Sequence, residues 1–165
     1  MTAAKQPQSA VAIVRGNAAE VAALIGEAAE IRGVDSVSAG DPGALAAAAA
    51  RALGCTVAVT GPVDHIAGPG GSAAVSNGVA MLGQVTGTGC MATALCGCFA
   101  AVNRDDPLRA ATEALAAFGV AAEHAAVGAR GPGSFHVNVY DCVAGLDPET
   151  LDSEVRIEAT GAAAA

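Results

Sequence analysis

The stretch Ala10-Val11-Ala12-Ile13-Val14-Arg15-Gly16-Asn17-Ala18-Ala19-Glu20 joins an apolar run directly to the start of a helix. Such a short, continuous apolar run is typical of a buried strand. Asn17 is placed to cap a helix expected over about residues 18–30, and Glu20, three residues later, completes a capping box. A buried strand followed at once by a helix predicts a layered α/β fold.

The same alternation of strands and helices continues along the chain. Asp41-Pro42 and Gly54 mark the ends of a second helix, and residues 55–60 form a second apolar run that predicts a buried strand. Residues 61–84 carry several turn signals, among which Asn77-Gly78 suits the tight turn of a hairpin. We therefore expect a mostly parallel sheet with a small antiparallel excursion.

The last part of the chain predicts two helices, one strand and a tail. The helices are expected at about residues 88–102 and 107–127, and residues 134–140 alternate between apolar and polar, which favours a half-exposed strand. Residues 152–165 are predicted to be a mobile tail. The predicted domain division is a disordered lead at 1–9, a folded domain at 10–146 and a C-terminal tail at 147–165.

Composition narrows the functional classes. The chain of 165 residues suits one domain, and its charge of −8 with scattered Lys and Arg excludes an extended nucleic-acid surface. Residues 1–9 lack the apolar segment of a secretory signal and no stretch is long enough to span a membrane, so we expect a cytoplasmic protein without membrane contact.

The odd count of five cysteines favours reduced thiols, and four of them are expected to be buried: Cys55, Cys96, Cys98 and Cys142.

The run Val85-Thr86-Gly87-Thr88-Gly89-Cys90-Met91 places two glycines and a thiol at the start of an expected helix. Small residues let backbone N–H groups approach an anion, and the helix dipole adds about half a positive charge at that end. Gly87, Thr88 and Gly89 could thus form an anion hole for a phosphate, with Cys90 beside it. An ordinary glycine turn before a helix explains the same spacing equally well.

Three positions follow expected strands at once: Arg15, Gly61 and Gly87. Ligands of parallel α/β sheets collect at the carboxyl ends of the strands. We therefore expect these positions to lie around one ligand site.

Six motifs occur in the order found in one known family. They are Arg15-Gly16-Asn17-Ala18-Ala19-Glu20-Val21, Arg32-Gly33-Val34-Asp35-Ser36, Val59-Thr60-Gly61-Pro62-Val63-Asp64, the run at 85–91, Asp106-Pro107-Leu108 and Gly131-Pro132-Gly133-Ser134-Phe135. From about residue 10 to 146 the sequence resembles the hydroxyethylthiazole kinases. The resemblance implies a ribokinase-like three-layer sandwich. It also implies transfer of a phosphate from ATP to the hydroxyl of 4-methyl-5-(2-hydroxyethyl)thiazole, a step in thiamine biosynthesis or salvage.

The resemblance implies roles for single residues. Arg15 and Thr60 are expected to contact ATP, and Gly87 is expected to contact the thiazole substrate. Asn17 and Glu20 are expected to organise Mg²⁺ and phosphate through water. Cys90 stands where most ribokinase-like enzymes carry an aspartate base, so it is the expected catalytic residue.

Simpler explanations exist for these residues without the resemblance. A capping box alone accounts for Glu20, a solvated strand end for Arg15, and a small residue at a helix start for Cys90. Thr60 is equally an ordinary strand residue. Only the agreement of several motifs favours the functional interpretation.

The N-terminal part of the family, which supplies much of the thiazole pocket and several strands, has no counterpart in this sequence. The chain is therefore expected to be an N-terminally truncated, nucleotide-side portion of the fold. One hypothesis is a kinase, active alone or completed by another chain that carries the missing half. The other is a non-catalytic remnant or nucleotide-binding partner subunit. The homotrimer of the family is the implied assembly.

Overall fold

The computed structural model describes residues 11–26 and 40–159, and strands and helices follow each other along both ranges. The predicted lead at 1–9 and the motif at 32–36 lie outside the described residues. The elements are β1 (Ile13–Asn17), α1 (Ala18–Leu24), α2 (Pro42–Leu53), β2 (Thr56–Thr60), β3 (Asp64–Gly68), β4 (Gly71–Val75), the 3₁₀ helix η2 (Ala80–Gln84), α3 (Thr88–Val102), α4 (Pro107–Val127), α5 (Pro132–Ala144), α6 (Pro148–Glu154) and β5 (Ile157–Ala159).

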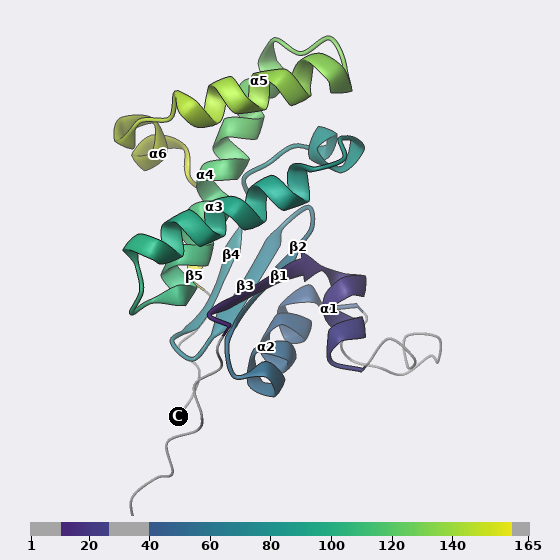
Figure 1. Cartoon of the computed structure of the whole chain (residues 1–165), viewed down its shortest axis with the longest axis vertical. Coiled ribbons are helices and arrows are strands. Elements are labelled where there is room, and N and C mark those ends of the chain that lie inside the picture. Colours follow the sequence, from purple (N-terminus) through teal and green to yellow (C-terminus); the bar gives the residue numbers. More distant parts are fainter. Residues whose placement is uncertain (1–10, 27–39, 160–165) are drawn as a thin grey trace, which may run out of the picture.

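The sheet lies between two helical layers (Figure 1). Helices α1 and α2 cover one face, and α3 and α4 cover the other, while α5 and α6 lie beyond the sheet along α4. Successive residues of a strand point to opposite faces. In β2, Val57 and Val59 accordingly pack with α1 and α2, and Ala58 packs with α4. The predicted three-layer α/β architecture is confirmed.

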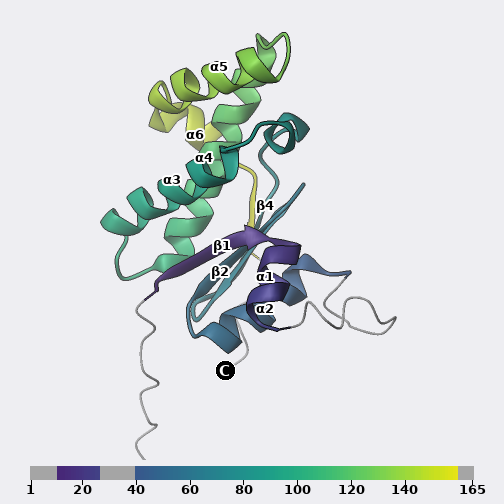
Figure 2. The same cartoon turned by 45° about the vertical axis from the view of Figure 1, so that its right-hand side comes forward.

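The direction of the strands differs from the prediction. The described strands follow the order β1-β2-β3-β4-β5, with β1 at one edge (Figure 2). Only β1 and β2 pair in parallel, whereas the other three pairings are antiparallel. The prediction of a mostly parallel sheet is therefore wrong for these strands. Residues 61–63 between β2 and β3 are too few for the crossover that a parallel pair requires.

The antiparallel excursion after β2 is confirmed, but its tight turn lies elsewhere. β3 and β4 turn at Pro69-Gly70, and Gly71 has a φ of 130°. The predicted turn Asn77-Gly78 instead leads from β4 to η2. A buried Asn77, 6% exposed, suits this tertiary position better than an exposed turn.

Helix boundaries agree with their caps. Asp41 accepts hydrogen bonds from the N–H groups of Gly43 and Ala44, and Gly54 ends α2 in a left-handed conformation with φ of 66°. The helices at 88–102 and 107–127 have the predicted bounds. α1 ends at Leu24, short of the prediction, and residues 27–30 lie outside the described ranges.

The strand predicted at 134–140 is wrong, since these residues belong to α5. Phe135 and Val139 are fully buried, but Val137 between them is 62% exposed. Burial at i and i+4 is the period of a helix, whereas a half-exposed strand would have buried all three. The first turn of α5 also contains Pro132, a favoured residue at that position.

The C-terminal tail is ordered over much of its predicted length. Residues 148–154 form α6, and residues 157–159 form β5, which pairs antiparallel with β4. Residues 160–165 are outside the described part. The mobile tail predicted from residue 152 is therefore wrong as far as Ala159.

The five cysteines are free thiols, in agreement with their odd number. Cys55 and Cys96 are buried as predicted, whereas Cys98 is exposed and Cys142 is half-buried. Cys96 and Cys98 lie two residues apart on α3, so they point about 200° apart and cannot share its buried face. Among the helices of the described ranges, none is long and apolar enough to cross a membrane.

Candidate active site

Two predicted site residues meet where β1 and β2 run side by side. Arg15 and Thr60 are 45 positions apart in sequence, yet Arg15 Nη2 donates a hydrogen bond to Thr60 Oγ1 at 2.7 Å. The Thr60 hydroxyl in turn donates to the carbonyl of Gly16 at 3.2 Å. Parallel pairing aligns the two strands in the same direction and thereby brings these side chains together.

The glycine-rich start of α3 lies against the same arginine. A Cβ atom at Gly89 would approach Arg15 Nη1 to 2.8 Å, so only glycine fits here without displacement of the guanidinium. Gly87 caps the helix with a φ of 102°, a conformation that other residues rarely adopt. The predicted glycine loop is thus shaped by two separate requirements for glycine.

Thr88 closes this loop from inside. Its hydroxyl lies 2.8 and 3.0 Å from the carbonyl oxygens of Leu82 and Val85 and shares its one proton between them. The side chain is buried, and its hydroxyl is already used by the loop. For an anion, the start of α3 therefore offers backbone N–H groups, which have no partner within the helix.

These elements surround a cavity of about 530 Å³. This volume lies within the range of roughly 300–1,000 Å³ found for small-molecule sites. Polar lining residues are Arg15, Thr60, Asp64, Asn77 and Thr88, and apolar ones include Val79, Leu82, Leu115 and Phe118. A charged ligand with an apolar ring system matches such a lining.

Asp64, the first residue of β3, is a site residue that the sequence prediction missed. Its carboxylate accepts a hydrogen bond from the N–H of Gly61 at 2.9 Å and lines the cavity. Burial raises the pKa of Asp64 to about 6, although Gly61, Arg15 and His65 each act to lower it. Its position after Gly61-Pro62-Val63 is typical of a loop, and the local sequence does not show that β3 folds back along β2.

Arg15 lines the cavity and leaves one of its donors unpaired within the described residues. Its Nε is buried without a hydrogen-bond partner in the part of the chain that the structure describes. A buried, unpaired donor costs free energy, so the position is one where an anion is more favourable than elsewhere. The same charge acts to lower the pKa of Cys96, but burial dominates and raises it to about 11.

Asn17 and Glu20 form the capping box predicted for α1. Asn17 Oδ1 accepts from the N–H of Glu20 at 2.9 Å, and Glu20 Oε2 accepts from the N–H of Asn17 at 2.7 Å. Both residues are exposed and lie outside the cavity lining. Within the described ranges, no group of three or more His, Cys, Asp and Glu residues is arranged to hold a metal ion.

Cys90 is the third residue of α3, directly after Thr88 and Gly89. Its side chain is exposed, and it is not among the residues that line the cavity. Cys90 therefore lies at the edge of the site, next to the loop that forms its wall.

A second wall of the cavity was also missed. It consists of residues 77–80, which follow β4, together with Phe118 and Gly119 of α4. Gly119 permits a close approach, since a Cβ atom there would lie 2.5 Å from Cβ of Asn77. Nothing in the local sequence marks this contact, because it joins segments 42 positions apart.

Comparisons with known proteins agree with the motifs. A family model described as the hydroxyethylthiazole kinase family matches residues 5–149. The chain is 47% identical over 154 residues to a hydroxyethylthiazole kinase of Rubrobacter xylanophilus, covering 92% of this chain and 57% of the relative. For a hydroxyethylthiazole kinase of Pyrococcus horikoshii, the identity is 45% over 149 residues, which is 89% of this chain and 56% of the relative.

A solved structure supports the same relationship. The structure of a hydroxyethylthiazole kinase protein from Pyrococcus horikoshii OT3 matches with a TM-score of 0.80 and 40% identity. The match covers 92% of this chain and 56% of that chain. The chain thus spans little more than half the length of these relatives.

Proposed function

This chain belongs to the hydroxyethylthiazole kinase family, and from that premise we propose that it transfers the γ-phosphate of ATP to the hydroxyl of 4-methyl-5-(2-hydroxyethyl)thiazole. One observation carries the proposal. The guanidinium of Arg15, bound to Thr60, lies against Gly89 at the start of α3 and faces a cavity large enough for a nucleotide. Phosphoryl transfer requires such a cluster of positive charge and N–H donors.

The phosphates of ATP are bound by Arg15 and by the N-terminus of α3 in this proposal. The planar guanidinium offers several donors to a phosphate, and Thr60 orients it through the 2.7 Å hydrogen bond. Gly87, Thr88 and Gly89 add backbone N–H groups and the positive end of the helix dipole. Gly87, at the mouth of this loop, contacts the thiazole.

Asn17 and Glu20 would hold Mg²⁺ through water in the proposed enzyme. Mg²⁺ in such sites is typically bound by one or two carboxylates together with phosphate oxygens, and its charge stabilises the phosphate in transfer. The capping bond uses one oxygen of Glu20, and a carboxylate has further lone pairs for a hydrated ion. The donor set therefore fits the ion.

Cys90 is the proposed catalytic residue for the substrate hydroxyl. It lies one residue beyond Gly89 at the edge of the site, and from there we expect it to meet a hydroxyl bound at the mouth of the loop. Its sulfur would accept the proton of that hydroxyl, or orient the hydroxyl, as the phosphate is transferred. A cytoplasmic location, where ATP is available, and the homotrimer of the family belong to the same proposal.

A direct assay tests the function. The purified chain is incubated with Mg-ATP and hydroxyethylthiazole, alone and with a second chain made from the part of the Pyrococcus horikoshii relative that the match leaves out. Formation of the thiazole phosphate, lost in Arg15→Ala but kept in Arg51→Ala, a variant of an exposed residue of α2, supports the kinase. Binding of ATP without transfer in either mixture supports the nucleotide-binding partner instead. Absence of both refutes the proposal.

A further inference from the structure

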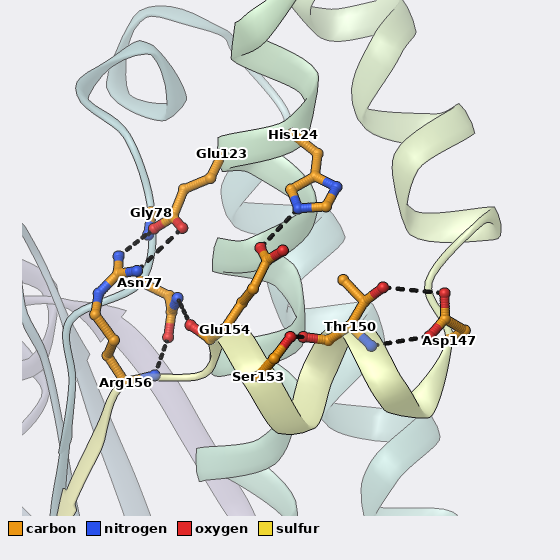
Figure 3. A network of polar contacts seen from close by, with 9 residues as sticks. All are labelled: Asn77, Gly78, Glu123, His124, Asp147, Thr150, Ser153, Glu154 and Arg156. Atoms are coloured by element: carbon orange, nitrogen blue, oxygen red, sulfur yellow. Dashed lines mark hydrogen bonds and ion pairs between the residues drawn. The ribbon is translucent and has the colours of Figure 1, made fainter.

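Residues 154–156, from the last residue of α6 to the start of β5, are connected to the second wall of the cavity by a network of polar contacts (Figure 3). The backbone N–H of Arg156 donates to Asn77 Oδ1 at 2.6 Å, and Asn77 Nδ2 donates to the carbonyl of Glu154 at 3.0 Å. The buried amide of Asn77 thus has both of its polar ends paired with the C-terminal segment.

Glu123 of α4 completes the network from the other side. Its carboxylate accepts a hydrogen bond from the N–H of Gly78 at 2.6 Å and forms an ion pair with the guanidinium of Arg156. A second hydrogen bond, from Arg156 Nη1 to Glu123 Oε2, measures 3.2 Å. Arg156 Nη2 also donates to the carbonyl of Ser76 at 3.0 Å.

The segment fixed by these contacts has little structure of its own. Residues 76–79 lie between β4 and η2 and belong to neither. Asn77, Gly78, Val79 and Ala80 nevertheless line the cavity that Arg15 and Gly89 also line. Their placement therefore depends on tertiary partners, namely Glu123 and residues 154–156.

We propose that Glu123 and Arg156 are positioning residues that hold residues 77–80 in place as the wall of the nucleotide site. This inference rests on the proposed function, because it assigns the cavity to ATP. The polar cluster around Arg15 suits the phosphates, so the wall with Val79, Leu115 and Phe118 suits the base. Loss of the Glu123–Arg156 pair frees the wall and weakens nucleotide binding without removing any phosphate contact.

Two variants with matched controls test this inference. Glu123→Ala and Arg156→Ala each break the pair, and Glu113→Ala and Arg109→Ala break a comparable pair of the same helix, whose Nε–Oε1 distance is 2.6 Å. That control pair is on the surface and lines no part of the cavity. Dissociation constants for ADP and ATP are measured on the full chain, together with hydrogen exchange of peptides covering residues 76–84 and 88–102.

The expected result is specific to the wall. Both test variants raise the dissociation constants about tenfold and accelerate exchange at 76–84, whereas exchange at 88–102 and the control variants stay at the wild-type level. Glu123→Gln keeps an acceptor for the N–H of Gly78. Its dissociation constants and its exchange rate at 76–84 should therefore lie between those of wild type and of Glu123→Ala.

The alternative outcomes separate the two proposals. Unchanged exchange at 76–84 in both test variants overturns the positioning role, and so does faster exchange with unchanged nucleotide affinity. Exchange needs no ligand, so it tests the network even if the wild-type chain binds no nucleotide. Absence of nucleotide binding in wild type would instead refute the proposed function.

Discussion

At the scale of single residues, Gly89 allows a specific prediction about the proposed phosphate site. A methyl group in Gly89→Ala would lie 2.8 Å from Arg15 Nη1 and push the guanidinium away from the loop. We expect ATP affinity to fall about tenfold or more, because a phosphate contact shifts out of position. Gly97→Ala is the control on the same helix, since nothing lies within 4 Å of its added Cβ. Calorimetric titration with ATP should show normal affinity for Gly97→Ala, and an equal loss in both variants would contradict the assignment.

Substitutions of Cys90 test how much the proposed reaction depends on a proton acceptor. Phosphoryl transfer relies mainly on positioning and charge stabilisation, so Cys90→Asp should retain or raise turnover in an active preparation. Cys90→Ala removes the acceptor and should lower turnover by about 10²-fold, in the lower range for a general base. Steady-state rates with hydroxyethylthiazole measure both. Complete loss of activity in a folded Cys90→Asp protein would show that the thiol itself is required.

Asp64 predicts an unusual dependence of stability on pH. Its pKa is raised from 3.8 to about 6 by burial, so the folded chain binds this proton more tightly than the unfolded chain does. The contribution of Asp64 is therefore fully present below about pH 4 and is lost as the pH rises through about 6. Asp64→Asn should remove this loss. Relative to wild type, its free energy of unfolding at pH 7.5 should therefore be more favourable than at pH 4 by up to about 2 kcal/mol. Urea unfolding at both pH values measures it, and an equal effect at the two values would contradict the raised pKa.

At the scale of elements, the sequence pattern of α5 disagrees with its burial: the alternation of apolar and polar residues predicts a strand, but the burial follows the period of a helix. Phe135→Ala should destabilise the fold by about 3–5 kcal/mol, because the side chain is fully buried. Val137→Ala should change stability by less than about 0.5 kcal/mol, because this side chain is 62% exposed. Thermal unfolding of the two variants compares them. Similar losses of stability in both variants would instead favour the half-exposed strand that the alternation predicted.

The starts of helices that carry capping residues could be predicted from the sequence, whereas the pairing partners of the strands could not. Asn17, Asp41 and Asp106 accept bonds from backbone N–H groups within three residues, so these helix starts are visible in the sequence. The antiparallel course of β3 and the pairing of β5 with β4 depend on which strand lies next in space. The site divides in the same way. Motifs marked Arg15 and Gly89. In contrast, tertiary packing brings Asp64 and Asn77 into the lining of the cavity and Glu123 into contact with Gly78 in its wall.

At the scale of the whole molecule, the C-terminal elements join the two sides of the fold. β5 extends the sheet at β4, and Arg156 connects that edge to α4. The composition of residues 152–165 hides this role, because the stretch has few large apolar side chains and its stabilising contacts are hydrogen bonds to distant residues. Polar contacts of this kind leave no periodic pattern in a sequence.

A chain ended after Leu146 gives the last prediction. It lacks α6, β5 and Arg156, so the buried amide of Asn77 loses both of its partners. An unsatisfied buried polar group costs about 1–3 kcal/mol, and the lost β4–β5 hydrogen bonds add to this cost. We expect a fall of at least about 2 kcal/mol in the free energy of unfolding, measured by urea denaturation. A mobile tail would contribute nothing to stability. An unchanged midpoint of urea denaturation would therefore show that residues 147–159 do not stabilise the domain, whereas a lower midpoint would show that they do.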